Sequence, residues 1–163
     1  MEKLTLRKIK SSDKKYFSAW WRDKELIKLT SGVLTPISDK GIEKNFLKIK
    51  ESKNDLHYLI LIDKGVIGHV SLIKRRSGWW ETQIVIGEKE YQNKGLGTMA
   101  IKALLKRTKR LGVSKTFLEV RPTNKRAVRT YEKCGFNRVG VKKYLRNKHP
   151  PETLRMELVE SRL

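Results

Sequence analysis

Hydrophobic positions in the first third of the chain recur first with the period of a strand and then with the period of helices. The pattern predicts, in order, a strand at 4–9, a helix after the N-cap residues 11–13, a loop at 29–36 and a second helix from about Ser38. The first helix presents an aromatic face, which consists of Tyr16, Phe17, Trp20 and Trp21. We expect this face to pack into the core, because an apolar stripe at helical spacing is typical of core packing.

Alternating apolar residues in the middle of the chain predict an antiparallel meander. Its three strands cover 57–63, 66–74 and about 79–87, with turns at 63–65 and 75–78. The remaining predicted elements are a helix at 97–111, a strand at 115–120, a helix at 124–134, and strands at 138–145 and 153–159 joined by a loop with Pro150 and Pro151. No internal repeat or linker interrupts this order. We therefore expect an α+β fold in a single domain over residues 1–163.

The chain is strongly basic, with 38 Lys and Arg against 17 Asp and Glu and a formal net charge of +21. Such a charge favours contact with polyanions, and it predicts association with RNA, the ribosome or a phosphate-bearing cofactor. A solvated surface rich in lysine explains the same charge without any partner. Basic residues are spread along the whole chain, although residues 138–148 are denser in them. The charge by itself therefore identifies no partner.

The apolar runs are short, and none approaches the ~18 residues that a membrane span requires. Residues 1–7 lack the apolar core of a secretory signal, so we expect a cytoplasmic protein. Cys134 is the single cysteine, and the three histidines show no metal-ligand spacing among themselves. We expect no disulfide, no bound metal and no membrane association.

Two glycines lie between the third strand of the meander and the next helix, in the sequence Gln-Asn-Lys-Gly-Leu-Gly-Thr at 92–98. Glycine lets the backbone come close to a ligand, and successive N–H groups at a helix N-terminus attract phosphate oxygens. The spacing differs from that of a nucleotide P-loop and from that of a dinucleotide fingerprint, so neither ATP nor NAD is the favoured ligand. The loop predicts a pyrophosphate site, although an ordinary strand-to-helix turn would also explain it.

A second motif begins about 27 residues after the glycine loop and comprises Asn124, Ala127, Tyr131 and the pair Gly135-Phe136. In this register, the two motifs together closely resemble the cofactor-binding core of the GNAT N-acetyltransferases, over residues 85–136. The N-terminal part, with its strand at 6–7 and Trp-Trp-Arg-Asp at 20–23, is more loosely similar to the ribosomal-protein and aminoglycoside N-acetyltransferases of that superfamily.

The resemblance implies a mostly antiparallel mixed sheet, flanked by helices and splayed between its central strands, with acetyl-CoA as co-substrate. Val85, Ile86 and Gly87 would then offer backbone groups to the pantetheine arm. The pyrophosphate loop would consist of Gln92, Asn93, Lys94, Gly95, Leu96, Gly97 and Thr98. Asn124 would contact the cofactor and Tyr131 would lie beside its sulfur, since residues seven apart share one helix face. Taken singly, a helix N-cap would explain Asn124, and a core aromatic would explain Tyr131.

Acetyl transfer to an amine requires a base, because a protonated amine must lose a proton before it attacks the thioester. We expect Glu119 to be that base, since several of the ribosomal-protein alanine acetyltransferases that the chain resembles carry Glu there, and some aminoglycoside acetyltransferases carry Asp. A solvated Glu paired with Lys is the alternative, and Glu81 is the reserve candidate. Tyr131 would protonate or hold the departing thiolate, at a cost of about 2 kcal/mol for a phenol of pKa near ~10 and a thiol of pKa near ~8.5. Cys134 has no histidine at activating spacing, so we expect no covalent enzyme intermediate.

The sequence leaves the acceptor amine open. We expect a protein N-terminus, such as that of a ribosomal protein, because the basic residues near the C-terminus would repel a polycation. One alternative is an aminoglycoside or another small amine, for which Glu51, Asp55 and Glu81 would supply an acidic pocket. The other is a non-catalytic RNA- or ribosome-binding module on the same fold.

Overall fold

Seven strands form one sheet in the computed structural model, which describes residues 2–30, 35–145 and 152–159. Their order across the sheet is β1-β2-β3-β4-β5-β7-β6. The strands are β1 (Leu4–Lys8), β2 (Leu56–Ile62), β3 (Gly65–Lys74), β4 (Trp80–Ile86), β5 (Lys115–Val120), β6 (Asn137–Lys143) and β7 (Glu152–Val159). The predicted meander is confirmed as β2, β3 and β4, with Asp63 in the left-handed region (φ 53°) at the first turn.

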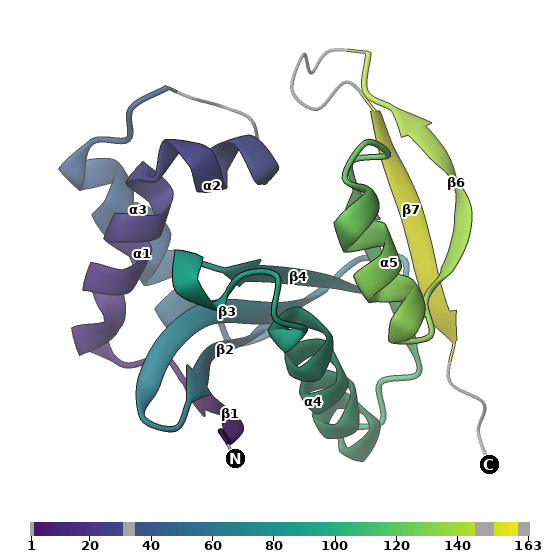
Figure 1. Ribbon diagram of the computed structural model, residues 1–163, viewed down its shortest axis with the longest axis horizontal. Coiled ribbons are helices and arrows are strands. Elements are labelled where there is room, and N and C mark those ends of the chain that lie inside the picture. Colours follow the sequence, from purple (N-terminus) through teal and green to yellow (C-terminus); the bar gives the residue numbers. More distant parts are fainter. Residues whose placement is uncertain (1, 31–34, 146–151, 160–163) are drawn as a thin grey trace.

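The sheet is antiparallel except between its two central strands. β4 and β5 run parallel and pair at only two positions, Trp80 with Thr116 and Glu81 with Phe117. Beyond these positions the two strands separate, and β5 continues in antiparallel pairing with β7 (Figure 1). The predicted mixed sheet with a splay between its central strands is therefore confirmed.

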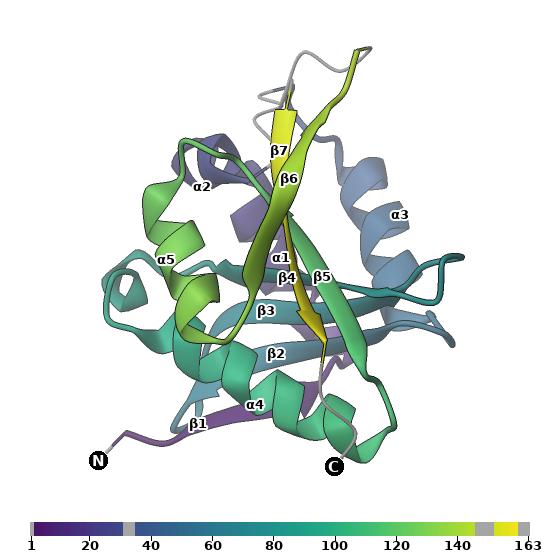
Figure 2. The same cartoon turned by 90° about the vertical axis from the view of Figure 1, so that its right-hand side faces the viewer.

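Helices cover both faces of the sheet. They are α1 (Lys14–Arg22), α2 (Lys24–Leu29), α3 (Asp39–Lys50), α4 (Leu96–Arg110) and α5 (Lys125–Lys133), with 3-10 turns η1 (Ser11–Asp13) and η2 (Lys89–Tyr91). The first three helices lie on one face, whereas α4 and α5 lie on the other (Figures 1 and 2). Within the described residues, no helix is long and apolar enough to cross a membrane.

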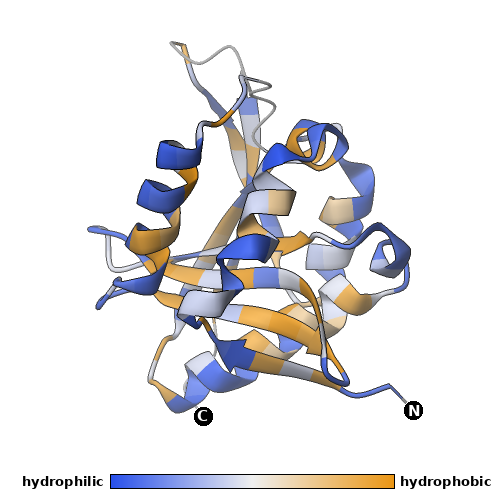
Figure 3. Cartoon of the chain, turned by 90° about the vertical axis from the view of Figure 1, so that its left-hand side faces the viewer, coloured by the Kyte–Doolittle hydropathy of each residue, from blue (hydrophilic) through white to orange (hydrophobic). Residues whose placement is uncertain are grey.

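The core forms on both faces because the side chains of β2 alternate between them. Ile60 and Ile62 pack in the cluster that α4 covers, while Leu59 and Leu61 pack against the aromatic face of α1. Burial on both faces explains why this strand is a continuous apolar run rather than an alternating one. Figure 3 shows largely hydrophobic strands, and helices whose outer sides are hydrophilic.

Helix α2 was not predicted by the sequence pattern. Asp23 caps it by accepting hydrogen bonds from the N–H groups of Glu25 and Leu26, and only Leu26 is buried in it. Six residues are too few to show a hydrophobic period. The predicted loop is therefore wrong at Leu29, which ends α2. Residues 31–34 of that loop, and the loop with Pro150 and Pro151, lie outside the described residues.

Candidate active site

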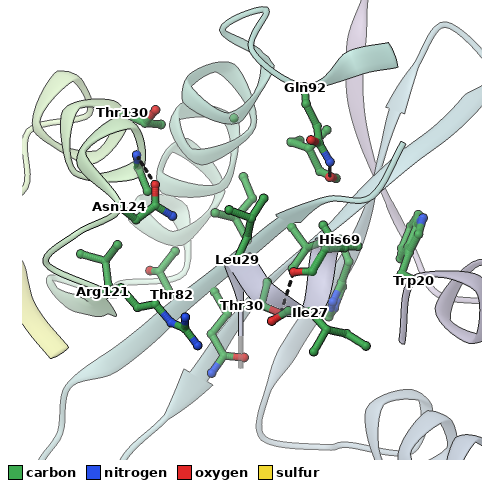
Figure 4. A pocket seen from close by; sticks show the side chains of 18 of the residues that line it. Trp20, Ile27, Leu29, Thr30, His69, Thr82, Gln92, Arg121, Asn124 and Thr130 are labelled. Carbon is green, nitrogen blue, oxygen red and sulfur yellow. Dashed lines mark hydrogen bonds between the residues drawn. The ribbon is translucent and has the colours of Figure 1, made fainter. Parts of the chain in front are cut away.

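A pocket of about 1240 Å³ lies where β4 and β5 separate. It is bordered by α1 and α2 on one side, by the end of β4 and the loop before α4, and by β5 and α5 on the other side (Figure 4). Pockets for single small ligands usually measure about 300–1000 Å³. The volume is therefore sufficient for two substrates to meet.

The glycine loop borders this pocket, since all of its residues 92–98 except Lys94 are among the described lining residues. Within the described part of the chain, none of the six N–H groups of residues 93–98 donates a hydrogen bond, and no side chain caps α4. Asn93 (φ 63°) and Gly95 (φ 76°) adopt the left-handed conformation, which turns the chain into the helix. Free N–H groups at a helix N-terminus are suited to phosphate oxygens, so the loop fits the pyrophosphate of a coenzyme.

Helix α5 adds cations that the sequence reasoning did not single out. Arg126, Arg129 and Lys133 line the pocket. Their spacing of three and then four residues places them on one face of the helix, which was the signal available in the sequence. Three cations near the glycine loop complement the several negative charges of a phosphorylated coenzyme.

The end of β4 is arranged differently from the expectation in two details. Gly87 N–H donates to the Ile67 carbonyl on β3. Because the hydrogen-bonding direction alternates along a strand, the backbone groups of Val85 point toward β3, and those of Ile86 point toward the gap between β4 and β5. The side chain of Gln92 lines the pocket but donates to the Ile86 carbonyl at 2.9 Å. Gln92 therefore braces the end of the strand, and its direct contact with a cofactor stays a prediction.

Gly87 also has a packing role, because a Cβ there would lie 2.1 Å from Nε1 of Trp20. That indole nitrogen donates to Glu88 at 3.1 Å. The glycine thus allows α1 to approach the end of β4 closely, which sets one wall of the pocket.

Asn124 and Tyr131 both line the pocket, as their shared helix face predicts. Asn124 also caps α5, since its Oδ1 accepts a hydrogen bond from Ala127 N–H at 3.2 Å. Tyr131 packs edge-on against Phe136, with ring centroids 6.2 Å apart. Burial raises the pKa of Tyr131 to about 12, so its hydroxyl keeps its proton at neutral pH.

The two candidate bases occupy different environments. Glu119 lines the pocket, and its Oε2 accepts a hydrogen bond of 2.6 Å from the hydroxyl of Tyr144. Burial, and then this bond to the carboxylate, raise the pKa of Tyr144. Glu81 does not border the described pocket and instead pairs with Arg75, whose Nε lies 2.8 Å from its Oε2. The geometry favours Glu119.

The other carboxylates considered for an acidic pocket, Glu51 and Asp55, are also absent from the described pocket wall. Asp55 accepts a hydrogen bond from the backbone N–H of Lys74 at 3.1 Å, at the edge of the sheet. The three residues therefore do not form the acidic surface that a polycationic acceptor would require.

Two histidines without metal-ligand spacing in the sequence meet in the structure. His57 Nδ1 and His69 Nε2 lie 3.1 Å apart across β2 and β3, and both residues line the pocket. Burial lowers the pKa of His69 to about 3, so the ring is neutral at physiological pH. Among the described residues, no group of three or more His, Cys, Asp or Glu is placed to hold a metal ion.

A family model for the acetyltransferase (GNAT) domain matches residues 3–137. The chain belongs to the GNAT acetyltransferase family. This membership confirms the predicted fold, the acetyltransferase activity and acetyl-CoA as co-substrate. A search of curated proteins gives no match.

Solved structures similar to this GNAT acetyltransferase include two that contain CoA and an amine acceptor. Spermidine N-acetyltransferase from Vibrio cholerae, in complex with CoA and spermine, is 25% identical over 96% of this chain and 95% of its own, with a TM-score of 0.82. The aminoglycoside acetyltransferase AAC(6')-Ib, in complex with coenzyme A and kanamycin, is 18% identical over 96% of this chain and 95% of its own, with a TM-score of 0.80. The second likeness shows the fold alone.

Proposed function

We propose that this GNAT acetyltransferase acetylates the α-amine of a protein N-terminus, such as that of a ribosomal protein. The observation that carries the proposal is the charge of the pocket. Glu119 is the single carboxylate among its described lining residues. A polycation requires several carboxylates, while a peptide N-terminus brings one positive charge.

The side chains of the pocket divide the proton transfers between them. Acetyl-CoA supplies the acetyl group as a thioester. Glu119 accepts the amine proton, and Tyr144 orients its carboxylate by binding Oε2 and leaving Oε1 to the substrate. Tyr131 donates a hydrogen bond to the departing sulfur. With a pKa of about 12 against ~8.5 for a thiol, complete proton transfer is uphill by about 5 kcal/mol, so a hydrogen bond is favoured over full protonation.

A thiol-release assay tests the proposal. Peptides with ribosomal-protein N-termini, spermine and kanamycin are compared as acceptors with wild type and with Glu119→Gln. We expect the highest kcat/KM for a peptide, and a loss of activity in the variant. A higher kcat/KM for spermine or kanamycin than for every peptide would exclude a protein N-terminus as the main acceptor.

A small polyamine is the second candidate acceptor, and one observation favours it. The spermidine N-acetyltransferase has 25% identity over nearly the whole length of both chains. The same acceptor panel decides between the two candidates. Binding to the ribosome or RNA, and a cytoplasmic location, remain predictions from the basic composition and the N-terminal sequence.

A further inference from the structure

Arg121 directly follows β5, and its half-buried side chain lines the pocket. Its Nε and Nη2 atoms are buried and make no hydrogen bond among the described residues. A buried donor without an acceptor is unfavourable, and native proteins rarely retain one. Because Arg121 lines the pocket, its missing partner is expected to be part of a ligand.

Two buried hydroxyl groups at the same pocket also lack a hydrogen-bond partner among the described residues. Six buried side-chain nitrogen and oxygen atoms lack hydrogen bonds in the described part of the chain, and four of them belong to the pocket residues Arg121, Thr82 and Thr153. Since Val120 of β5 pairs with Leu154 of β7, Thr153 lies opposite Arg121 in the neighbouring strand. Figure 4 shows Arg121 and Thr82 within the pocket. A guanidinium with a hydroxyl beside it offers several donors to one anion.

Arg121 and Glu119 point to the same side of the sheet. Leu118 and Val120 pack into the cluster with α4 and α5, so the residues that alternate with them face the side of α1–α3. Two residues along a strand span about 7 Å. Glu119 bonds to Tyr144 and not to Arg121, so neither charge neutralises the other through an ion pair. The pocket therefore presents a carboxylate and, two residues further along the chain, a guanidinium with two nitrogens that lack a partner among the described residues.

We propose that Arg121, assisted by Thr153, binds a carboxylate of the acceptor that lies about one residue from the amine. This inference rests on the proposed function and names the acceptor class within it. The carboxylate is supplied by an acidic second residue of the peptide. The planar guanidinium suits a carboxylate because it can donate two parallel hydrogen bonds. Arg121 thus determines specificity, and Glu119 carries out the chemistry.

The test compares acceptors that differ only in charge near the amine. They are peptides beginning Ala-Glu, Ala-Gln and Ala-Lys, together with free alanine. The variants are Arg121→Gln, Arg121→Lys and Thr153→Val, with Arg110→Gln as a control that removes a guanidinium from the exposed end of α4. Melting temperatures without ligand verify folding, and thermal shifts with acetyl-CoA verify cofactor binding.

We expect wild type and Arg110→Gln to prefer Ala-Glu over Ala-Gln by on the order of tenfold in kcat/KM. Arg121→Gln should abolish this preference, mainly through KM, while Arg121→Lys and Thr153→Val should reduce it. The unliganded Tm of Arg121→Gln should not fall, because the variant removes two buried donors that have no partner among the described residues. Free alanine as the best acceptor would instead point to the α-carboxylate of an amino acid and would overturn the proposed protein acceptor.

Three results would overturn the inference alone. The first is a preference for Ala-Glu that survives Arg121→Gln. The second is an equal loss of kcat/KM for all acceptors in that variant, which would assign the guanidinium to the reaction. The third is a loss of the acetyl-CoA thermal shift in that variant, which would assign the guanidinium to cofactor binding. A fall of several degrees in the Tm of Arg121→Gln would likewise assign it a structural role. Failure of every peptide and of alanine, with spermine still acetylated, would overturn the proposed function together with the inference.

Discussion

Glu119 keeps one carboxylate oxygen without a partner among the described residues, and this oxygen is available to accept a proton. One substitution tests its proposed role as a base. Glu119→Gln should lower kcat/KM at neutral pH by about 10²–10⁴-fold, because the amide cannot accept the proton. The defect should shrink as pH rises, since more of the acceptor amine is then already deprotonated. The measurement is a pH profile of kcat/KM with one peptide acceptor.

Glu81→Gln is the matched control. It makes the same change to a carboxylate on the neighbouring strand β4, and this carboxylate pairs with Arg75. Its profile should follow that of wild type. A pH-dependent defect in Glu81→Gln, with a uniform loss or no loss in Glu119→Gln, would transfer the role to Glu81.

Tyr131 is predicted to act only at the departing sulfur. Tyr131→Phe should reduce kcat by about ten- to a thousand-fold and leave the acetyl-CoA thermal shift nearly unchanged, because the ring and its contact with Phe136 are retained. Steady-state and single-turnover kinetics measure this effect. An unchanged rate in a single turnover would reduce Tyr131 to a packing residue.

His69 links stability to pH. Its folded-state pKa of about 3 lies below the unfolded value of ~6.5, so acid protonates the unfolded chain first. The folded state is fully favoured above pH ~6.5, and it loses up to about 1.4 kcal/mol per pH unit as pH falls toward 3. Urea unfolding of His69→Leu should show a smaller fall in unfolding free energy between pH 6 and 4 than wild type. Equal slopes would show that the buried imidazole is not responsible.

At the scale of elements, the junction of the glycine loop and α4 is predicted to bind the coenzyme pyrophosphate. A Cβ on Gly97 would contact only Thr130 Cγ2, at 3.7 Å, so substitution there should not disturb folding. Gly97→Glu places a carboxylate where phosphate is expected, and it should abolish the thermal shift by acetyl-CoA. The negative charge itself is tolerated at a helix N-terminus.

Gly97→Ala provides the control, because it adds the Cβ without the charge and should retain most of the shift. Differential scanning fluorimetry with and without acetyl-CoA measures both variants. Equal shifts for wild type and Gly97→Glu would contradict the assignment of the loop.

At the scale of the whole molecule, the net charge of +21 is predicted to accelerate binding of the polyanionic coenzyme. The association rate should fall by on the order of tenfold between low salt and ~0.5 M salt, because the Debye length shortens. The double substitution of Arg126 and Arg129 by Gln should weaken this dependence, whereas Arg110→Gln should leave it nearly unchanged. Stopped-flow measurements at several salt concentrations provide the test, and an unaltered dependence in the double variant would remove these arginines from the encounter surface.

Most helices and strands of the whole molecule could be predicted from local patterns. The helix predicted at 97–111 is α4, the strand at 115–120 is β5, and Asn124 starts α5 as its N-cap. These features depend on residues close together in the chain, whose spacing and capping chemistry are visible in the sequence. The family motif likewise lies within one βαβα stretch. Helix α2 was missed because it is short and is held by a cap and a single buried leucine.

The site depended on which side chains meet across strands, and this required the fold. The sequence left Glu119 and Glu81 as alternative bases, but in the structure Glu119 lines the pocket, whereas Glu81 pairs with Arg75 and is not among the described lining residues. The contact between His57 and His69, and the two guanidinium nitrogens of Arg121 that lack a partner among the described residues, have no local signature. Strand register and the splay of β4 from β5 bring these groups together or keep them apart. Local residue patterns therefore revealed the family and predicted a cofactor loop, whereas long-range packing determined which charged and titratable groups line the pocket.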